Sequence, residues 1–126
     1  MTGAVRPQVV VAADPGSAPT ALREVRAGLE EEGVPHRLLT RPGGAAALAA
    51  LAAGASELAV GLGLDADEVV VTHARLPPGA PLLRVPVAAG PLALRTAGQD
   101  AARLVTTRPL AGLPGSRGAP YGPSPV

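Results

Sequence analysis

Strand-like and helix-like segments alternate along this chain, and that alternation constrains the fold more than any other feature of the sequence. Residues 8–13 are a short β-branched run that breaks at Asp-Pro-Gly, residues 14–16, as a buried strand followed by a turn does. A helix, a strand at 36–40 and an alanine-rich helix at 45–55 should follow. A hairpin, a short strand and a last helix complete the order. We therefore expect one α/β domain of three layers, in which helices cover a mixed, mostly parallel sheet.

The first helix has a recognisable start, inner face and end. Pro19 suits its first turn, and we expect Ser17 or Thr20 to cap it. Gly33 is placed to end the helix, and Pro35 prevents its return. Its buried face is predicted from apolar residues at helical spacing: Leu22, Val25 and Leu29.

The middle of the chain predicts a hairpin. The strand-like runs 58–64 and 69–72 are separated by so few residues that they must pair antiparallel, because a parallel return needs about a dozen or more. A proline-rich loop at 76–81 should lead to a short strand at 82–85. From residue 112 to residue 126, glycine and proline dominate without periodicity. We expect the domain to span residues 1–111 and the remainder to be a disordered tail.

Two further expectations concern the later helices. In the helix at 45–55, Leu48 and Leu51 should point inward. Thr96 and Gln99 have the spacing of a capping box, which predicts that the last helix begins at Thr96.

Composition excludes several classes of function. The chain has no cysteine, so disulfide scaffolds, thiolate zinc sites and cysteine nucleophiles are ruled out. Phe, Trp, Ile, Lys and Asn are also absent, which a G/C-rich genome explains most simply, and Tyr121 is the only aromatic residue. Without stacking platforms and with a net charge of +1, the chain should bind neither nucleic acid nor membranes. We find no secretory signal and no apolar run near the roughly 20 residues of a membrane span, so we expect a cytoplasmic protein.

Few side chains of this sequence are candidates for binding a ligand, a metal ion or a nucleotide. Asp14 ends the first strand, where α/β folds often bind ligands, but aspartate is also an ordinary turn residue there. His36 and His73 have no ligand partner at metal-binding spacing, which favours structural roles. Gly-Leu-Gly at 61–63 lacks the third glycine of a dinucleotide loop and is better explained by backbone crowding within a strand. The acidic residues 65–68 fit a hairpin turn better than a calcium loop.

The end of the first helix has an unfavourable arrangement of charges. Glu30, Glu31 and Glu32 crowd the last turn of the first helix, where the negative end of the helix dipole disfavours carboxylates. A solvated acidic helix end is the simpler explanation. The sharper hypothesis is that one of these carboxylates meets a cation held by a partner protein, because rules broken without compensation often mark function.

Three blocks of sequence resemble the small subunit of the diol/glycerol dehydratase-reactivating factor. The first is residues 22–35, Leu-Arg-Glu-Val-Arg-Ala-Gly-Leu-Glu-Glu-Glu-Gly-Val-Pro, which is the most specific of the three. The second combines 60–65 with the proline-rich residues 76–82, and the third combines 100–105 with Pro-Leu at 109–110. The blocks occur in family order and cover roughly residues 8–110.

The resemblance implies a function. In this family the small subunit pairs with a large ATPase subunit, which carries ATP or ADP, in a heterotetramer. The client is a diol or glycerol dehydratase, which uses adenosylcobalamin and retains the damaged cofactor after inactivation. The small subunit resembles the client's medium subunit and exchanges with it, so that damaged cobalamin leaves. The resemblance thus implies a non-catalytic, chaperone-like subunit without a cofactor of its own, and a five-stranded sheet like that of anticodon-binding domains.

The resemblance also implies a site. In the family the middle glutamate contributes to a divalent-metal site on the large subunit, so the matching residue is Glu31 and the expected ion is Mg²⁺, with Glu30 and Glu32 in the same interface. Two alternatives stay open: a medium subunit of a cobalamin-dependent dehydratase, typically a longer chain, and a stand-alone small-molecule-binding domain, suggested by Asp14. Either glycerol or 1,2-diol dehydratase fits as client, and association with a bacterial microcompartment stays open.

Overall fold

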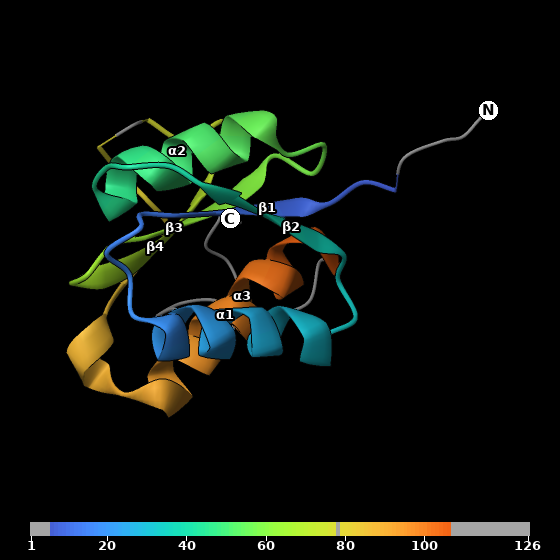
Figure 1. Cartoon of the computed structure of the whole chain (residues 1–126). Coiled ribbons are helices and arrows are strands. Elements are labelled where there is room, and N and C mark those ends of the chain that lie inside the picture. The colour runs from blue at the N-terminus through green and yellow to red at the C-terminus, as the bar shows by residue number, and fades with distance from the viewer. Residues whose placement is uncertain (1–5, 78, 107–126) are drawn as a thin grey trace, which may run out of the picture.

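A sheet of five strands lies between helices in the computed structural model, which describes residues 6–77 and 79–106 (Figure 1). The elements in chain order are β1 (Val9–Ala13), α1 (Pro19–Glu31), β2 (His36–Thr40), α2 (Ala45–Ala55), β3 (Val60–Leu64), β4 (Glu68–His73), β5 (Leu83–Pro86), a 3₁₀ turn (Val87–Ala89) and α3 (Pro91–Thr106). The expected alternation of strands and helices is confirmed. The expected tail at 112–126 lies outside the described residues. Within them, no helix has both the length and the apolar character that crossing a membrane requires.

The sheet is mixed, with strand order β2-β1-β3-β4-β5. β1 pairs parallel with both β2 and β3, whereas β4 pairs antiparallel with β3 and with β5. Only β4 therefore runs against the other four strands. The antiparallel hairpin and the mostly parallel sheet are both confirmed.

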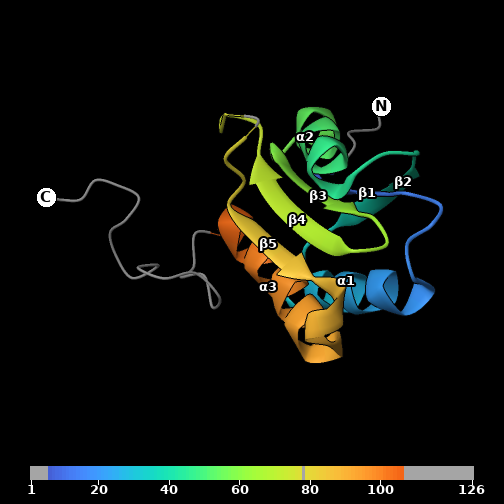
Figure 2. The ribbon, with the colours of Figure 1, turned by 90° about the vertical axis from the view of Figure 1, so that its left-hand side faces the viewer.

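Helices cover both faces of the sheet. α2 lies on one face, while α1 and α3 pack against each other on the opposite face (Figures 1 and 2). Because successive side chains of a strand point to opposite faces, Val9 and Val11 join the core under α1 and α3, whereas Val10 and Ala12 join the core under α2. β1 is buried along its whole length, as a strand covered on both faces should be.

The glycines of β3 allow α2 to lie directly on the sheet. A Cβ atom at Gly63 would overlap the backbone of Ala45 and Ala49, and one at Gly61 would overlap the backbone of Ala53. Backbone crowding, the structural explanation of the Gly-Leu-Gly sequence, is therefore confirmed.

The prediction that Leu51 points inward is wrong. Leu48 is 3% exposed, but Leu51 is 46% exposed. Every residue of α2 is apolar, so its periodicity does not select a buried face. The contact with β3 selects it instead by turning Ala49 to the sheet, and Leu51 lies about 200° further round the helix.

Two predictions about helix starts are also wrong. The N-cap of α1 is Ala18, and no side chain caps this helix. Thr20 lies inside the helix, and the Ser17 hydroxyl donates to the carbonyl of Leu64 at 3.1 Å. α3 begins at Pro91, so Thr96 lies inside it, and its hydroxyl donates to the carbonyl of Leu92 at 3.0 Å. Proline suits a first helical position, and the 3₁₀ turn delivers the chain to that point.

Candidate functional site

The acidic end of α1 is closed by a Schellman motif. The N–H of Gly33 donates to the carbonyl of Glu30 at 3.0 Å, and the N–H of Val34 donates to the carbonyl of Leu29 at 3.2 Å. Gly33 has a φ of 73°, a left-handed conformation that favours glycine. The prediction that Gly33 ends this helix is confirmed. The motif fixes the backbone from which the side chains of residues 30–32 project.

Side chains of α3 meet two of the three glutamates. Gln99 Nε2 donates to Glu31 Oε1 at 2.7 Å, and Arg95 Nη1 lies 3.5 Å from Glu31 Oε2. Arg103 Nη2 lies 3.4 Å from Glu32 Oε2. The idea that the triplet lacks compensation is therefore wrong for Glu31 and Glu32, because a neighbouring helix supplies donors and positive charge.

Sequence reasoning missed these donors on α3. Arg95, Gln99 and Arg103 are spaced by four residues, which places them on one face of a helix. That spacing can be read from the sequence, but the element that packs against this face cannot. In the structure the face packs against α1.

Arg95 is held mainly by Glu24. Its Nη2 and Nε atoms lie 2.6 Å and 2.9 Å from Glu24 Oε1, and these hydrogen bonds and the charge of Glu24 raise the pKa of the guanidinium. The Glu24 side chain is only 16% exposed. Arg95 is thus anchored by one carboxylate and touches Glu31 with its remaining nitrogen.

The Glu31 carboxylate remains accessible from outside. Its side chain is 44% exposed, and the neighbouring Glu30 is exposed and makes no side-chain hydrogen bond or ion pair with any residue that the structure describes. Among the described residues, three carboxylates, those of Glu24, Glu31 and Glu32, contact the guanidinium groups of Arg95 and Arg103. No group of three His, Cys, Asp or Glu side chains within residues 6–77 and 79–106 could hold a metal ion by itself.

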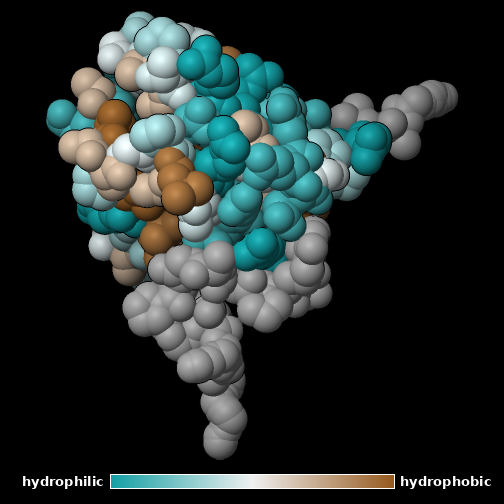
Figure 3. Space-filling model, turned by 90° about the horizontal axis from the view of Figure 1, so that it is seen from below, coloured by the Kyte–Doolittle hydropathy of each residue, from teal (hydrophilic) through white to brown (hydrophobic). Residues whose placement is uncertain are grey.

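The surface formed by α1 and α3 also has an apolar part. Seen from outside this layer, most of the surface is hydrophilic and apolar residues gather on one side of it (Figure 3). A groove between β5 and α3 is lined by Leu83, Val85 and Leu92, among others, and Leu92 is 77% exposed.

Asp14 has a turn role. Its Oδ2 accepts the N–H of Gly16 at 2.7 Å, and its Oδ1 accepts the N–H of Gly43 at 2.9 Å. Both carboxylate oxygens therefore bind backbone of the turns at this end of the sheet, which supports the structural interpretation of Asp14.

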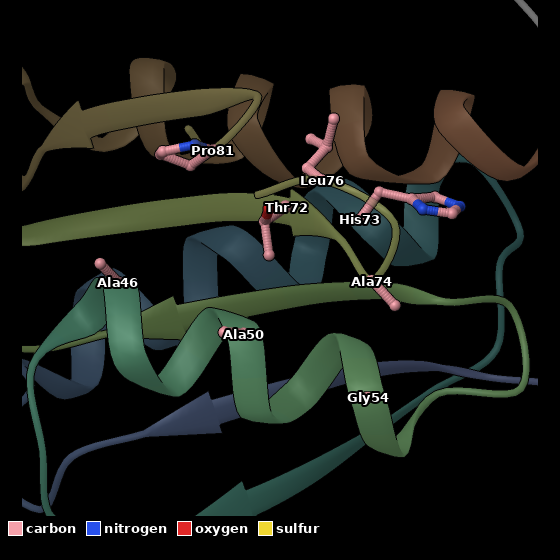
Figure 4. A pocket seen from close by; sticks show the side chains of 8 residues that line it. All are labelled: Ala46, Ala50, Gly54, Thr72, His73, Ala74, Leu76 and Pro81. Carbon is pink, nitrogen blue, oxygen red and sulfur yellow. The ribbon is translucent and has the colours of Figure 1, made fainter. Parts of the chain in front are cut away.

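His36 and His73 both make structural contacts. His36 Nε2 accepts a hydrogen bond from Arg26 Nε at 3.2 Å, and burial together with the Arg26 charge lowers the pKa of the imidazole. His73 Nδ1 accepts the N–H of Arg75 at 3.1 Å. His73 also lines a small cavity beside Thr72, whose other walls are small or apolar side chains of α2 and of the loop after β4 (Figure 4).

Comparison with known proteins identifies the family. A family model described as dehydratase medium subunit matches residues 6–111. The chain is 41% identical over 92 residues to the diol dehydratase-reactivating factor small subunit of Klebsiella michiganensis, covering 72% of this chain and 74% of that relative. The chain belongs to the family of dehydratase-reactivating factor small subunits. The resemblance carried by the three sequence blocks is thereby confirmed.

Solved structures agree with this family assignment. A chain described as glycerol dehydratase reactivase has a TM-score of 0.79 and 45% identity, and the match covers 84% of this chain and 97% of that one. A chain from a diol dehydratase-reactivating factor complexed with ADP and Mg²⁺ has a TM-score of 0.78 and 37% identity, covering 84% and 98%. These similarities favour a reactivating-factor small subunit over a medium subunit of the dehydratase itself.

Proposed function

We propose that this chain is the non-catalytic subunit of a two-subunit reactivating factor, whose large subunit hydrolyses ATP. The factor acts on an adenosylcobalamin-dependent diol or glycerol dehydratase and promotes the release of damaged cobalamin. The observation that carries the proposal is the match to glycerol dehydratase reactivase, which extends over 97% of that chain at 45% identity. The ADP and Mg²⁺ in the related diol dehydratase-reactivating factor support a nucleotide site on the large subunit.

The family to which the chain belongs supports subunit exchange as the mode of action. Its family model is that of dehydratase medium subunits, so this fold suits the position that a medium subunit occupies in the dehydratase. A chain that can take that position, and can also bind a large ATPase subunit, can open the client enzyme to cofactor release. Adenosylcobalamin belongs to the client, and the exchange takes place in the cytoplasm.

On this proposal Glu31 is a ligand that the chain lends to Mg²⁺ at the interface with the large subunit. Mg²⁺ prefers oxygen ligands in an octahedral arrangement, and it is commonly bound by one or two carboxylates. Glu31 offers one accessible carboxylate, with Glu30 and Glu32 beside it in the sequence. The remaining ligands come from the large subunit, bound nucleotide and water, in a heterotetramer of the two kinds of subunit.

A reactivation assay tests this function. Dehydratase blocked with cyanocobalamin is mixed with the large subunit, ATP and Mg²⁺, and this chain is added or omitted. We expect cobalamin release and recovered activity only with both subunits, and the chain alone should neither hydrolyse ATP nor bind cobalamin. Full reactivation without this chain would contradict the proposal, and tight cobalamin binding by the chain alone would favour the medium-subunit alternative.

A further inference from the structure

The Glu31 carboxylate is held from behind by α3 while its outer side faces solvent. We propose that Gln99 is a positioning residue, whose side-chain amide orients the Glu31 carboxylate toward the cation of the large subunit, with Arg95 as its second support. This inference rests on the proposed function, because it assumes that Glu31 meets that cation. It assigns a role in cation binding to two residues of α3 that do not themselves contact the ion.

Side chains of α3 contact both oxygens of the Glu31 carboxylate. Gln99 Nε2 binds Glu31 Oε1 at 2.7 Å, and Arg95 Nη1 approaches Oε2 at 3.5 Å. Each carboxylate oxygen has two lone pairs, so each contacted oxygen keeps one for a further partner. With 44% of the side chain exposed, those lone pairs are reachable from outside. A glutamate that is already ordered loses less side-chain entropy when it binds a cation.

The chemistry of the two donors suits a cation site. The shorter contact comes from the neutral amide of Gln99, which orients the carboxylate without repelling a divalent ion. The positive charge of Arg95 is taken up mainly by Glu24, at 2.6 Å from Nη2. The two donors therefore hold Glu31 through one neutral amide and one guanidinium that is already paired with Glu24.

Close packing of the two helices brings Gln99 within reach. A Cβ atom at Gly28 would overlap the carbonyl oxygen of Arg95, and one at Gly98 would overlap the carbonyl oxygen of Val25. These two glycines let α1 and α3 approach backbone to backbone. The helix crossing thus places Gln99 close enough for its side chain to reach Glu31.

The test is the Mg²⁺ dependence of association between the full chain and the large subunit, measured for Gln99→Met. This change keeps the side-chain length and removes the donor. We expect association in Mg²⁺ to weaken about fivefold, because the Glu31 side chain would then have to be ordered on binding, at a cost of about 1 kcal/mol. In EDTA the variant and the wild type should associate equally. Gln8→Met, the same chemical change at a glutamine remote from Glu31, should behave as wild type in both conditions.

The double variant separates this inference from the proposed function. If Glu31→Gln weakens association in Mg²⁺ and adding Gln99→Met causes no further loss, Gln99 acts through Glu31 as proposed. If Glu31→Gln weakens association but Gln99→Met does not, the positioning role is wrong and the proposed function stands. Equal weakening by Gln99→Met in Mg²⁺ and EDTA would also overturn it, since that pattern indicates only a structural role. If Glu31→Gln itself binds as wild type, the assumed role of Glu31 in the proposed function is refuted, and this inference with it.

Discussion

Asp65 and Glu31 bind different kinds of partner through their carboxylate oxygens. Asp65 Oδ1 accepts the N–H groups of Asp67 and Glu68, and its Oδ2 accepts the N–H of Ala45 at the start of α2. Burial opposes ionisation of Asp65, but these backbone hydrogen bonds outweigh it and lower its pKa. Such a residue ties the β3–β4 turn to α2. Glu31, by contrast, binds side chains of α3 through its carboxylate oxygens, and its side chain is 44% exposed.

His36 makes stability depend on pH. Its pKa is lowered from 6.5, first by burial and further by the Arg26 charge, although its hydrogen bond to the Val34 carbonyl and the Glu30 charge oppose this. The folded state therefore favours the neutral imidazole, so its contribution to stability is complete above about pH 6.5 and is lost as the pH falls through the lowered folded-state pKa. Thermal unfolding of wild type and His36→Gln between pH 7.5 and 5.5 should show a smaller loss for the variant. Parallel pH profiles would contradict this assignment.

Helices in this protein approach their neighbours through glycine. Gly28 and Gly98 set the crossing of α1 and α3, and Gly61 and Gly63 set the distance of α2 from the sheet. The chain has no Phe or Trp to fill wide spaces, and its buried core consists mainly of valine, leucine and alanine. Close layers are how such small side chains reach native packing density.

Alanine substitutions at two helical glycines should have opposite effects. Gly98→Ala places a methyl group against the Val25 carbonyl and should lower the free energy of unfolding by about 1–3 kcal/mol. Gly54→Ala, in α2, meets no atom within 4 Å and should raise it by about 0.5–1 kcal/mol, because alanine favours helix. Urea unfolding measures both. Similar stabilities for the two variants would show that the helix crossing tolerates the added atom.

Local sequence patterns predict most helices and strands of this protein. Features that depend on contacts between helices and strands are not predicted by these patterns. The strands, the end of α1 at Gly33 and the antiparallel hairpin follow from residue type and spacing. The start of α3 and the exposure of Leu51 do not, because the 3₁₀ turn and the β3 glycines determine them. In the site, the sequence and the family resemblance single out residues 30–32. The support by Gln99 was not predictable, since it requires knowledge of which helix packs beside α1.

In the whole molecule, the proposed site and the apolar groove share one layer. Leu92 and Gln99 are seven residues apart on α3, so they lie within about 20° of each other on the same helix face. Leu92 is 77% exposed, and Gln99 touches Glu31. A large subunit that reaches Glu31 would therefore also meet this part of α3. α2, with its exposed Leu51, lies on the opposite face of the sheet (Figure 1).

In the proposed complex, Glu31 joins the chain to the large subunit through Mg²⁺. Titration of the large subunit with wild type and Glu31→Gln, in Mg²⁺ and in EDTA, tests it most directly. The control is Glu57→Gln, which changes a surface glutamate that pairs with Arg37 and not with the residues around Glu31. Glu31→Gln should weaken association by about tenfold or more in Mg²⁺, equivalent to about 1.4 kcal/mol, with unchanged thermal unfolding and an unaffected control. Wild-type affinity of Glu31→Gln in Mg²⁺ would contradict it.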